Sequence, residues 1–206
     1  GRRLSRRRIR KDRLSGNLTR GQAGGLPGLR EWREIGCFAT AIEALCQTWR
    51  PDVLHAHSPA LCGQAALRAG RRLGIPVVYE IRAFWEDAAV GNGTGREGSP
   101  RYWLTRGLEN NVVSGADAVI TICQGLKDDL VARGTADAKI TIMPNGVDLG
   151  LFGQPVPRDP ALADQLGLGT GPVIGFIGSF YDYEGIDDVI AAMPRLIARH
   201  PQARLL

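Results

Sequence analysis

The stretch ITIMPNGVDLGLF (Ile140 to Phe152) closes one strand-and-helix domain, and GPVIGFIGSFYDYEGIDDVIAAM (residues 171–193) opens another. The first stretch is an apolar run that enters a Pro-Asn-Gly turn. The second is an apolar run, a glycine-containing loop and then apolar residues at helical spacing. Proline and glycine are frequent in residues 149–171, which lie between the two. The sequence therefore predicts two domains joined by a linker.

The same alternation of strands and helices extends upstream of this junction. Short apolar runs predict strands at 52–56, 76–81, 116–122 and 139–144. Amphipathic stretches predict helices at 32–49, 59–74, 101–113 and 124–134, and a glycine-rich loop is expected at 89–100. This order predicts an α/β fold with a parallel sheet and right-handed crossovers, and such sheets bind ligands at the carboxyl ends of their strands.

Charge is distributed unevenly along the 206 residues. The formal net charge is +5, but nine of the 26 basic residues lie in the first twenty positions beside a single acid. The remaining chain carries 17 basic and 20 acidic residues, so its charge does not favour nucleic acid as a partner. We expect residues 1–28 to be a disordered basic tail, with contact to an anionic membrane surface or to nucleic acid as the alternative.

Cysteine usage and hydropathy indicate a compartment. The four cysteines occur singly, without the CxxC spacing of a zinc ribbon or a redox dithiol. The Arg-rich start is not followed by the apolar stretch of a signal peptide. We therefore expect a cytoplasmic protein, peripheral to the inner membrane if the tail binds lipid.

The run DVLHAHSP ends the strand at 52–56 with polar side chains. His57 and Ser58 follow this strand at its carboxyl end, and His55 lies two residues earlier on the same side. This run resembles a strand of family 4 glycosyltransferases, whose GT-B fold places two Rossmann-like domains across a cleft. The resemblance implies that His57 and Ser58 line the acceptor side of that cleft. We expect His55 to be a hydrogen-bonded core histidine, because a zinc site would need further ligands and His200 lies far along the chain.

The run VVYEIRAFWED carries charged and aromatic residues at the next strand end. The family resemblance places Arg82 where many relatives have a histidine near the reacting sugar, and makes Arg82 the candidate catalytic residue. Glu80, Trp85 and Glu86 are expected beside it in the acceptor-side cleft. The alternative is a structural ion pair between Arg82 and Glu86 or Glu80. This run and GREGSPRYWLTRGLE are most similar to glycosyltransferases associated with exosortase and exopolysaccharide gene clusters.

Two further motifs resemble the family hinge and donor site. PNGVD places Asn145 at the hinge and adds it to the acceptor-side cleft. In FIGSFYDYEG, backbone amides near Gly178, Ser179 and Gly185 are expected to hold the donor diphosphate before a helix. Many relatives have an arginine and a lysine in this loop, where this chain has Ser179 and Glu184. Arg82, or residues outside this chain, would then have to supply the positive charge.

We therefore expect a retaining glycosyltransferase of hexosyl type that moves a sugar from a nucleotide sugar to a glycan or lipid-linked acceptor, without a metal or other cofactor. Its expected parts are the tail 1–28, a Rossmann-like acceptor-side domain at 29–148, the linker 149–171 and the start of a nucleotide-sugar domain at 172–206. We expect a partial chain that is inactive by itself. The alternatives are a non-catalytic Rossmann-type remnant and a nucleotide-sugar epimerase of the GT-B fold.

Cys123 lies at the turn after 116–122. We do not expect it to act as a nucleophile, because no basic partner is recognisable.

Overall fold

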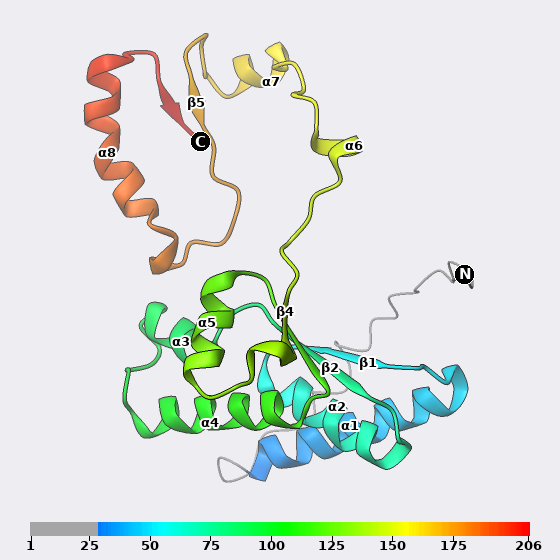
Figure 1. Ribbon diagram of the computed structural model, residues 1–206. Helices are drawn as coiled ribbons and strands as arrows, with labels where there is room; N and C mark the ends of the chain where they lie inside the picture. The colour runs from blue at the N-terminus through cyan, green and yellow to red at the C-terminus, as the bar shows by residue number, and fades with distance from the viewer. Residues whose placement is uncertain (1–28) are drawn as a thin grey trace. The chain divides into compact units, whose positions relative to one another are not determined.

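The computed structural model describes residues 29–206, and these divide into two compact units (Figure 1). One unit contains residues up to Arg82 together with Gly107–Met143, and the other contains Ala83–Arg106 together with Pro144–Leu206. The prediction for the basic tail, residues 1–28, lies outside the described residues. The expected domain boundaries at 148 and 171 remain predictions.

The first unit is built on a four-stranded parallel sheet in the order β1-β2-β3-β4. The strands are β1 (Leu54–His57), β2 (Val77–Ile81), β3 (Ala118–Thr121) and β4 (Ile140–Ile142). The helices are α1 (Leu29–Trp49), α2 (Ala60–Leu73), the part of α4 (Pro100–Gly115) from Gly107 on, α5 (Gln124–Ala132) and the short η1 (Asp137–Lys139). All four strands predicted for this sheet are present, and the α/β fold with a parallel sheet is confirmed.

The two faces of this sheet differ in burial. Because the strands follow one another in sequence order, right-handed crossovers place their connecting helices on one face. Side chains on one face are buried: Ala56, Val77, Tyr79, Ile81, Val119 and Thr121. On the other face, His55 and His57 are exposed and Glu80 is partly exposed. Polar side chains are therefore accessible on this second face.

Close packing joins α2 and α4 to the buried face of the sheet. Gly63 in α2 leaves no room for a side chain, because an added Cβ would lie 2.4 Å from Val112 Cγ1 and 2.8 Å from Tyr79 Cε2. The hydroxyl of Tyr79 donates a hydrogen bond of 2.7 Å to Glu109 Oε1, and both residues are 0% exposed. These contacts fix α2 and α4 beneath the strands that carry the candidate site residues.

The second unit contains a separate two-stranded parallel sheet. Its strands are β5 (Val173–Ile174) and β6 (Arg204–Leu205). Its helices are α3 (Trp85–Gly91), the start of α4, α6 (Leu149–Phe152), α7 (Pro160–Gln165), η2 (Asp182–Glu184) and α8 (Ile186–Arg199). α7 begins with Asp159 as its cap, whose side chain accepts a hydrogen bond from the Leu162 backbone N–H at 3.1 Å.

Two details of this unit differ from the prediction. The strand expected from Pro172 onward is short, although backbone hydrogen bonds continue its pairing with the last residues as far as the bond from Phe176 N to Leu206 O at 2.8 Å. α3 was not predicted, because the glycines after it suggested a loop, whereas Glu86 and Asp87 in its first turn favour a helix start. The helix predicted after the glycine-containing loop is present as α8, and it continues through Pro194 as expected. In residues 29–206 no helix is long and apolar enough to cross a membrane.

Candidate functional site

The carboxyl ends of β1 and β2 bring the first predicted site residues together. The Ser58 backbone N–H donates to Glu80 O at 2.8 Å, which continues the strand pairing beyond β1. The Arg82 backbone N–H in turn donates to the hydroxyl of Ser58 at 3.4 Å. Arg82 is exposed and Ser58 is partly exposed. The two strand ends therefore hold a hydroxyl and an exposed arginine next to each other.

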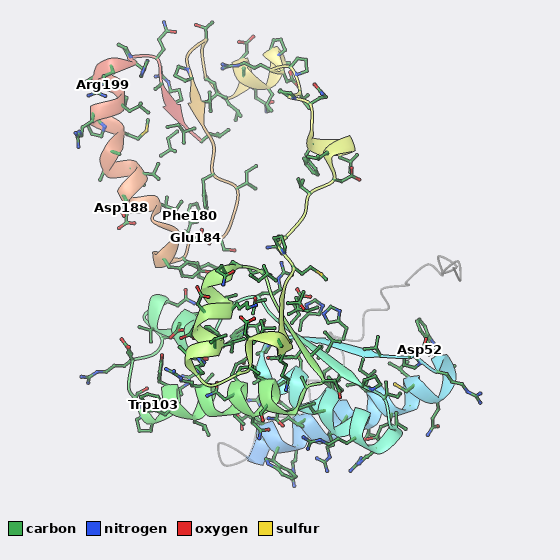
Figure 2. The ribbon with its side chains drawn as sticks, viewed as in Figure 1. Asp52, Trp103, Phe180, Glu184, Asp188 and Arg199 are labelled. Carbon is green, nitrogen blue, oxygen red and sulfur yellow. The ribbon has the colours of Figure 1, made fainter. Side chains whose placement is uncertain are left out.

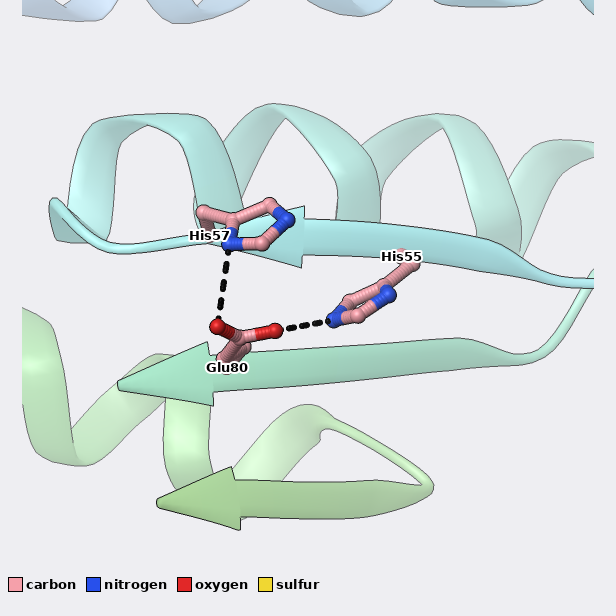
Figure 3. A group of neighbouring side chains, drawn as sticks. All are labelled: His55, His57 and Glu80. Atoms are coloured by element: carbon pink, nitrogen blue, oxygen red, sulfur yellow. Dashed lines mark ion pairs between the residues drawn. The ribbon is translucent and has the colours of Figure 1, made fainter. Parts of the chain in front are cut away.

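His55, His57 and Glu80 form a compact cluster on the accessible face of the sheet (Figure 3). Glu80 Oε2 lies 3.0 Å from His55 Nε2, and Glu80 Oε1 lies 3.4 Å from His57 Nδ1. The two imidazole rings are stacked, with centroids 4.7 Å apart and planes at 19°. The cluster forms because parallel pairing places His57 opposite Glu80, and because His55 and His57 point to the same face.

The prediction that His55 is a core histidine is wrong. Its side chain is 41% exposed, because it projects from the accessible face of the sheet, although it does have the expected polar partner in Glu80. The sequence also suggested that a zinc site at His55 and His57 lacked further ligands. The structure supplies Glu80, which the sequence placed in the cleft without linking it to the histidines.

The other predicted acceptor-side residues belong to the second unit. Trp85 lies in the first turn of α3 and is 50% exposed, whereas Glu86 beside it is buried. Asn145 is exposed before α6. In the same unit the hydroxyl of Tyr102 donates to Asp87 Oδ1 at 2.8 Å, a contact that the sequence did not reveal. This hydrogen bond to Asp87 and burial of the tyrosine raise the pKa of Tyr102.

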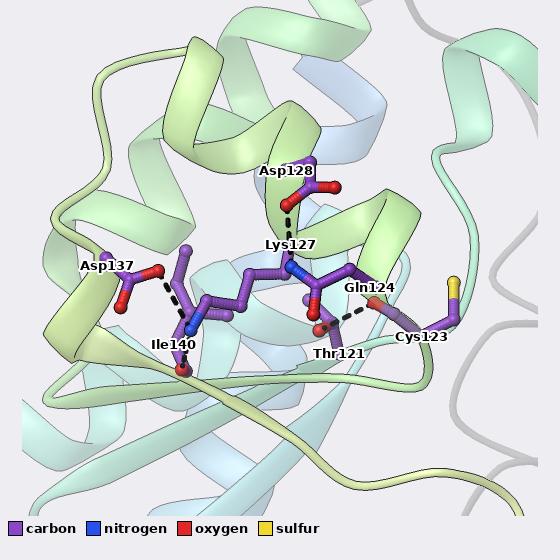
Figure 4. A network of polar contacts seen from close by, with 7 residues as sticks. All are labelled: Thr121, Cys123, Gln124, Lys127, Asp128, Asp137 and Ile140. Carbon is purple, nitrogen blue, oxygen red and sulfur yellow. Dashed lines mark hydrogen bonds and ion pairs between the residues drawn. The ribbon is translucent and has the colours of Figure 1, made fainter.

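Cys123 caps α5 at the carboxyl end of β3 (Figure 4). Its backbone oxygen accepts a hydrogen bond of 3.2 Å from the Thr121 hydroxyl. Lys127, one turn into α5, directs its ammonium group to Asp137 Oδ1 at 2.9 Å and Ile140 O at 3.3 Å. Lys127 therefore joins α5 to β4. Its ammonium group contacts Asp137 and Ile140 rather than the Cys123 thiol.

The predicted donor loop lies between β5 and α8. Gly185 is the cap of α8 and has a left-handed backbone conformation with φ of 67°, which favours glycine. Gly178 and Ser179 are exposed and are separated from the helix start by η2. Only Gly185, of these three, stands at the helix start itself, where unpaired backbone N–H groups are available to an anion.

The amino end of α8 is acidic (Figure 2). Asp187 and Asp188 lie in its first turn, and Glu184 ends η2 just before it. These carboxylates stabilise the positive end of the helix dipole, and for the same reason they oppose the approach of a diphosphate. These three carboxylates therefore contribute negative rather than positive charge to the expected donor site.

Comparison with known families identifies the class of protein. The family model for glycosyltransferase family 4 matches residues 3–151, which is more than half of the chain. The chain is 32% identical over 194 residues to a D-inositol 3-phosphate glycosyltransferase of Segniliparus rotundus, covering 89% of this chain and 42% of that protein. It is 28% identical over 160 residues to a glycogen synthase of Mycobacterium tuberculosis, covering 77% of this chain and 36% of that protein. The chain belongs to glycosyltransferase family 4, and it spans less than half the length of these relatives.

Solved structures show the same fold. The structure of Anabaena HepE in complex with UDP and glucose superposes with a TM-score of 0.61 at 17% identity, covering 84% of this chain and 42% of that one. A putative UDP-N-acetylglucosamine 2-epimerase from Listeria monocytogenes superposes with a TM-score of 0.56 at 16% identity, covering 89% of this chain and 46% of that one. The fold is therefore of the GT-B type, with Rossmann-like parallel sheets.

Proposed function

We propose that the whole protein is a retaining glycosyltransferase that moves a hexosyl group from a nucleotide sugar to a hydroxyl of a glycan or lipid-linked acceptor. The observation that carries this proposal is the family 4 match together with the strand ends that hold Ser58 and Arg82. In parallel α/β sheets this edge is where ligands bind. The similarity of the run around Arg82 to proteins of exopolysaccharide gene clusters supports a role in polysaccharide synthesis.

Arg82 has the central role in the proposed reaction. As the sugar leaves the donor, negative charge accumulates on the departing diphosphate, and groups aimed at that charge lower the barrier. A guanidinium offers parallel N–H donors that match phosphate oxygens. The acidic start of α8 makes this contribution more important, because Glu184, Asp187 and Asp188 cannot supply it. No step of this proposal uses a metal ion.

The remaining residues have supporting roles in the proposal. His57, Ser58, Trp85 and Asn145 contact the acceptor, while backbone groups near Gly178, Ser179 and Gly185 contact the diphosphate. The four cysteines are unpaired, which supports a reducing compartment such as the cytoplasm. We expect the 206-residue chain alone to be inactive, because both substrates must be held by complete domains on either side of a cleft.

The test uses the full-length protein with a panel of nucleotide sugars and measures release of the nucleoside diphosphate. We expect Arg82→Ala to lower turnover by on the order of 100-fold, as removal of one charge-stabilising donor does in other enzymes. Arg30→Ala is the matched control, because Arg30 is exposed on α1 and pairs with Glu34. Unchanged turnover in Arg82→Ala would reduce Arg82 to a structural role.

An epimerase is the second candidate, because a UDP-N-acetylglucosamine 2-epimerase shares the fold. The two activities differ in their need for an acceptor. A transferase releases the diphosphate as the sugar moves to an acceptor hydroxyl, whereas an epimerase changes the configuration of the sugar without one. Conversion of a nucleotide sugar to its epimer in the absence of acceptor would therefore favour the epimerase over the transferase.

A further inference from the structure

We propose that His55, His57 and Glu80 form a binding site for a divalent transition metal, with zinc as the ion that best fits the donor set. Two imidazole nitrogens and one carboxylate are ligands that zinc accepts, and imidazole also suits nickel, copper and cobalt. Three protein ligands leave one coordination position open to water. This inference does not rest on the proposed sugar transfer.

The separations between the donor atoms are close to the separations found in a metal centre. One ligand atom from each of the three residues lies within 4.8 Å of the other two. Ligand atoms bound tetrahedrally to one zinc ion at about 2.0–2.1 Å are separated by about 3.4 Å. Glu80 contacts the two rings through different oxygens, with Oε2 at 3.0 Å from His55 Nε2 and Oε1 at 3.4 Å from His57 Nδ1, and both distances are comparable with that separation. Small side-chain rotations would therefore bring all three ligands to one ion.

The backbone holds the three side chains on the same face before any ion binds. His55 and His57 alternate along β1, and the parallel register sets Glu80 of β2 opposite His57. A ligand set fixed by strand pairing loses less conformational entropy on binding than one carried by a loop. The stacked rings at 4.7 Å both turn a nitrogen toward the carboxylate (Figure 3), so the three donors already converge.

Access to the cluster is open within this unit. The side chains of His55 and His57 are 41% and 52% exposed, and that of Glu80 is 13% exposed. An ion can therefore reach the imidazole nitrogens from solvent, and the lower exposure of Glu80 limits the competition of water for its carboxylate. Exposure of both rings also means that replacing a histidine removes a ligand without opening a cavity in the core.

The experiment measures zinc affinity of the whole chain by competition with a chromophoric chelator. We expect one ion per chain and affinity at least about 10-fold lower in His57→Asn and in Glu80→Gln, because even changes to groups behind metal ligands cost 10- to 100-fold. Glu80→Gln keeps the side-chain shape and removes the charge. Far-ultraviolet circular dichroism of each variant checks that the fold is retained.

Two matched controls exclude other ligands. His200→Asn removes the remaining histidine of the chain, at the end of α8, and should leave the affinity unchanged. Replacing the exposed Cys37 and Cys123 by serine should also leave it unchanged, because the proposed site contains no thiolate. Retained affinity in His57→Asn and Glu80→Gln, or loss of affinity in the cysteine variant, would overturn the proposal and leave the cluster as an ion pair only.

Discussion

The sheet of the first unit and the β5-α8-β6 segment of the second share one motif but differ in packing. In the first sheet Tyr79, Ile81 and Val119 are fully buried. In the second segment the strands expose more than a third of Val173 and Ile174, and α8 exposes 57% of Ile190. Both sequences have the periodicity of buried elements. Periodicity alone therefore does not make a core.

The reason is the number of elements that share each face. Four strands give α2, α4 and α5 a surface on which to pack, whereas a two-stranded sheet is marginal by itself. The apolar residues of α8 have few neighbours among the described residues. The comparison predicts that truncating the same kind of side chain has different costs in the two regions.

The largest difference is expected between two aliphatic truncations. Leu130→Ala in α5 removes a side chain that is 0% exposed, and should lower the local free energy of unfolding by about 2–5 kcal/mol through lost burial and a residual cavity. Ile190→Ala in α8 should change it by less than about 0.5 kcal/mol, because the side chain is largely exposed. Hydrogen exchange followed by mass spectrometry reports both regions separately. Equal costs in the two variants would mean that α8 is packed as well as α5.

A smaller difference is expected between two tyrosine hydroxyls, one in each unit. Tyr79→Phe removes a buried hydrogen bond to a carboxylate, Glu109, and should cost about 1.5–3 kcal/mol. Tyr102→Phe removes the bond to Asp87, which is partly buried, and should cost about 0.5–1.5 kcal/mol. Hydrogen exchange of peptides from α4 and from each unit measures the loss of local unfolding free energy in both variants. A greater loss of unfolding free energy in Tyr102→Phe would contradict the proposal that the first unit is the more tightly packed.

A third comparison concerns two helical glycines of the first unit, whose replacement is expected to have opposite effects on stability. Gly63→Ala should cost about 1–3 kcal/mol, because its Cβ would meet Val112 and Tyr79. Gly125→Ala in α5 meets nothing within 4 Å and should stabilise by about 0.5–1 kcal/mol. Denaturant unfolding of the two variants measures the change in the free energy of unfolding for each. A neutral Gly63→Ala would show that α2 moves away from the sheet at little cost, and that the first unit is less tightly packed than described.

Several features were readable from local sequence and are present in the structure. The four strands and their connecting helices follow from the alternation of apolar runs with amphipathic stretches. The strand ends at His57 and Arg82 follow from the order of those runs, because parallel strands place their carboxyl ends on one edge. α3 was missed because the glycines around Gly93 obscured a short helix whose signal is the pair Glu86 and Asp87.

The sequence by itself determined the α/β class, the family and the edge of the sheet on which candidate residues lie, because these depend on spacing within short segments. Only the tertiary structure decided that His55 is exposed and that Glu80 joins both histidines. Strand register and face are set by pairing between distant segments and by the layer of helices on one side of the sheet. Such contacts have no period within the local sequence, so the His55, His57 and Glu80 cluster could be found only in three dimensions.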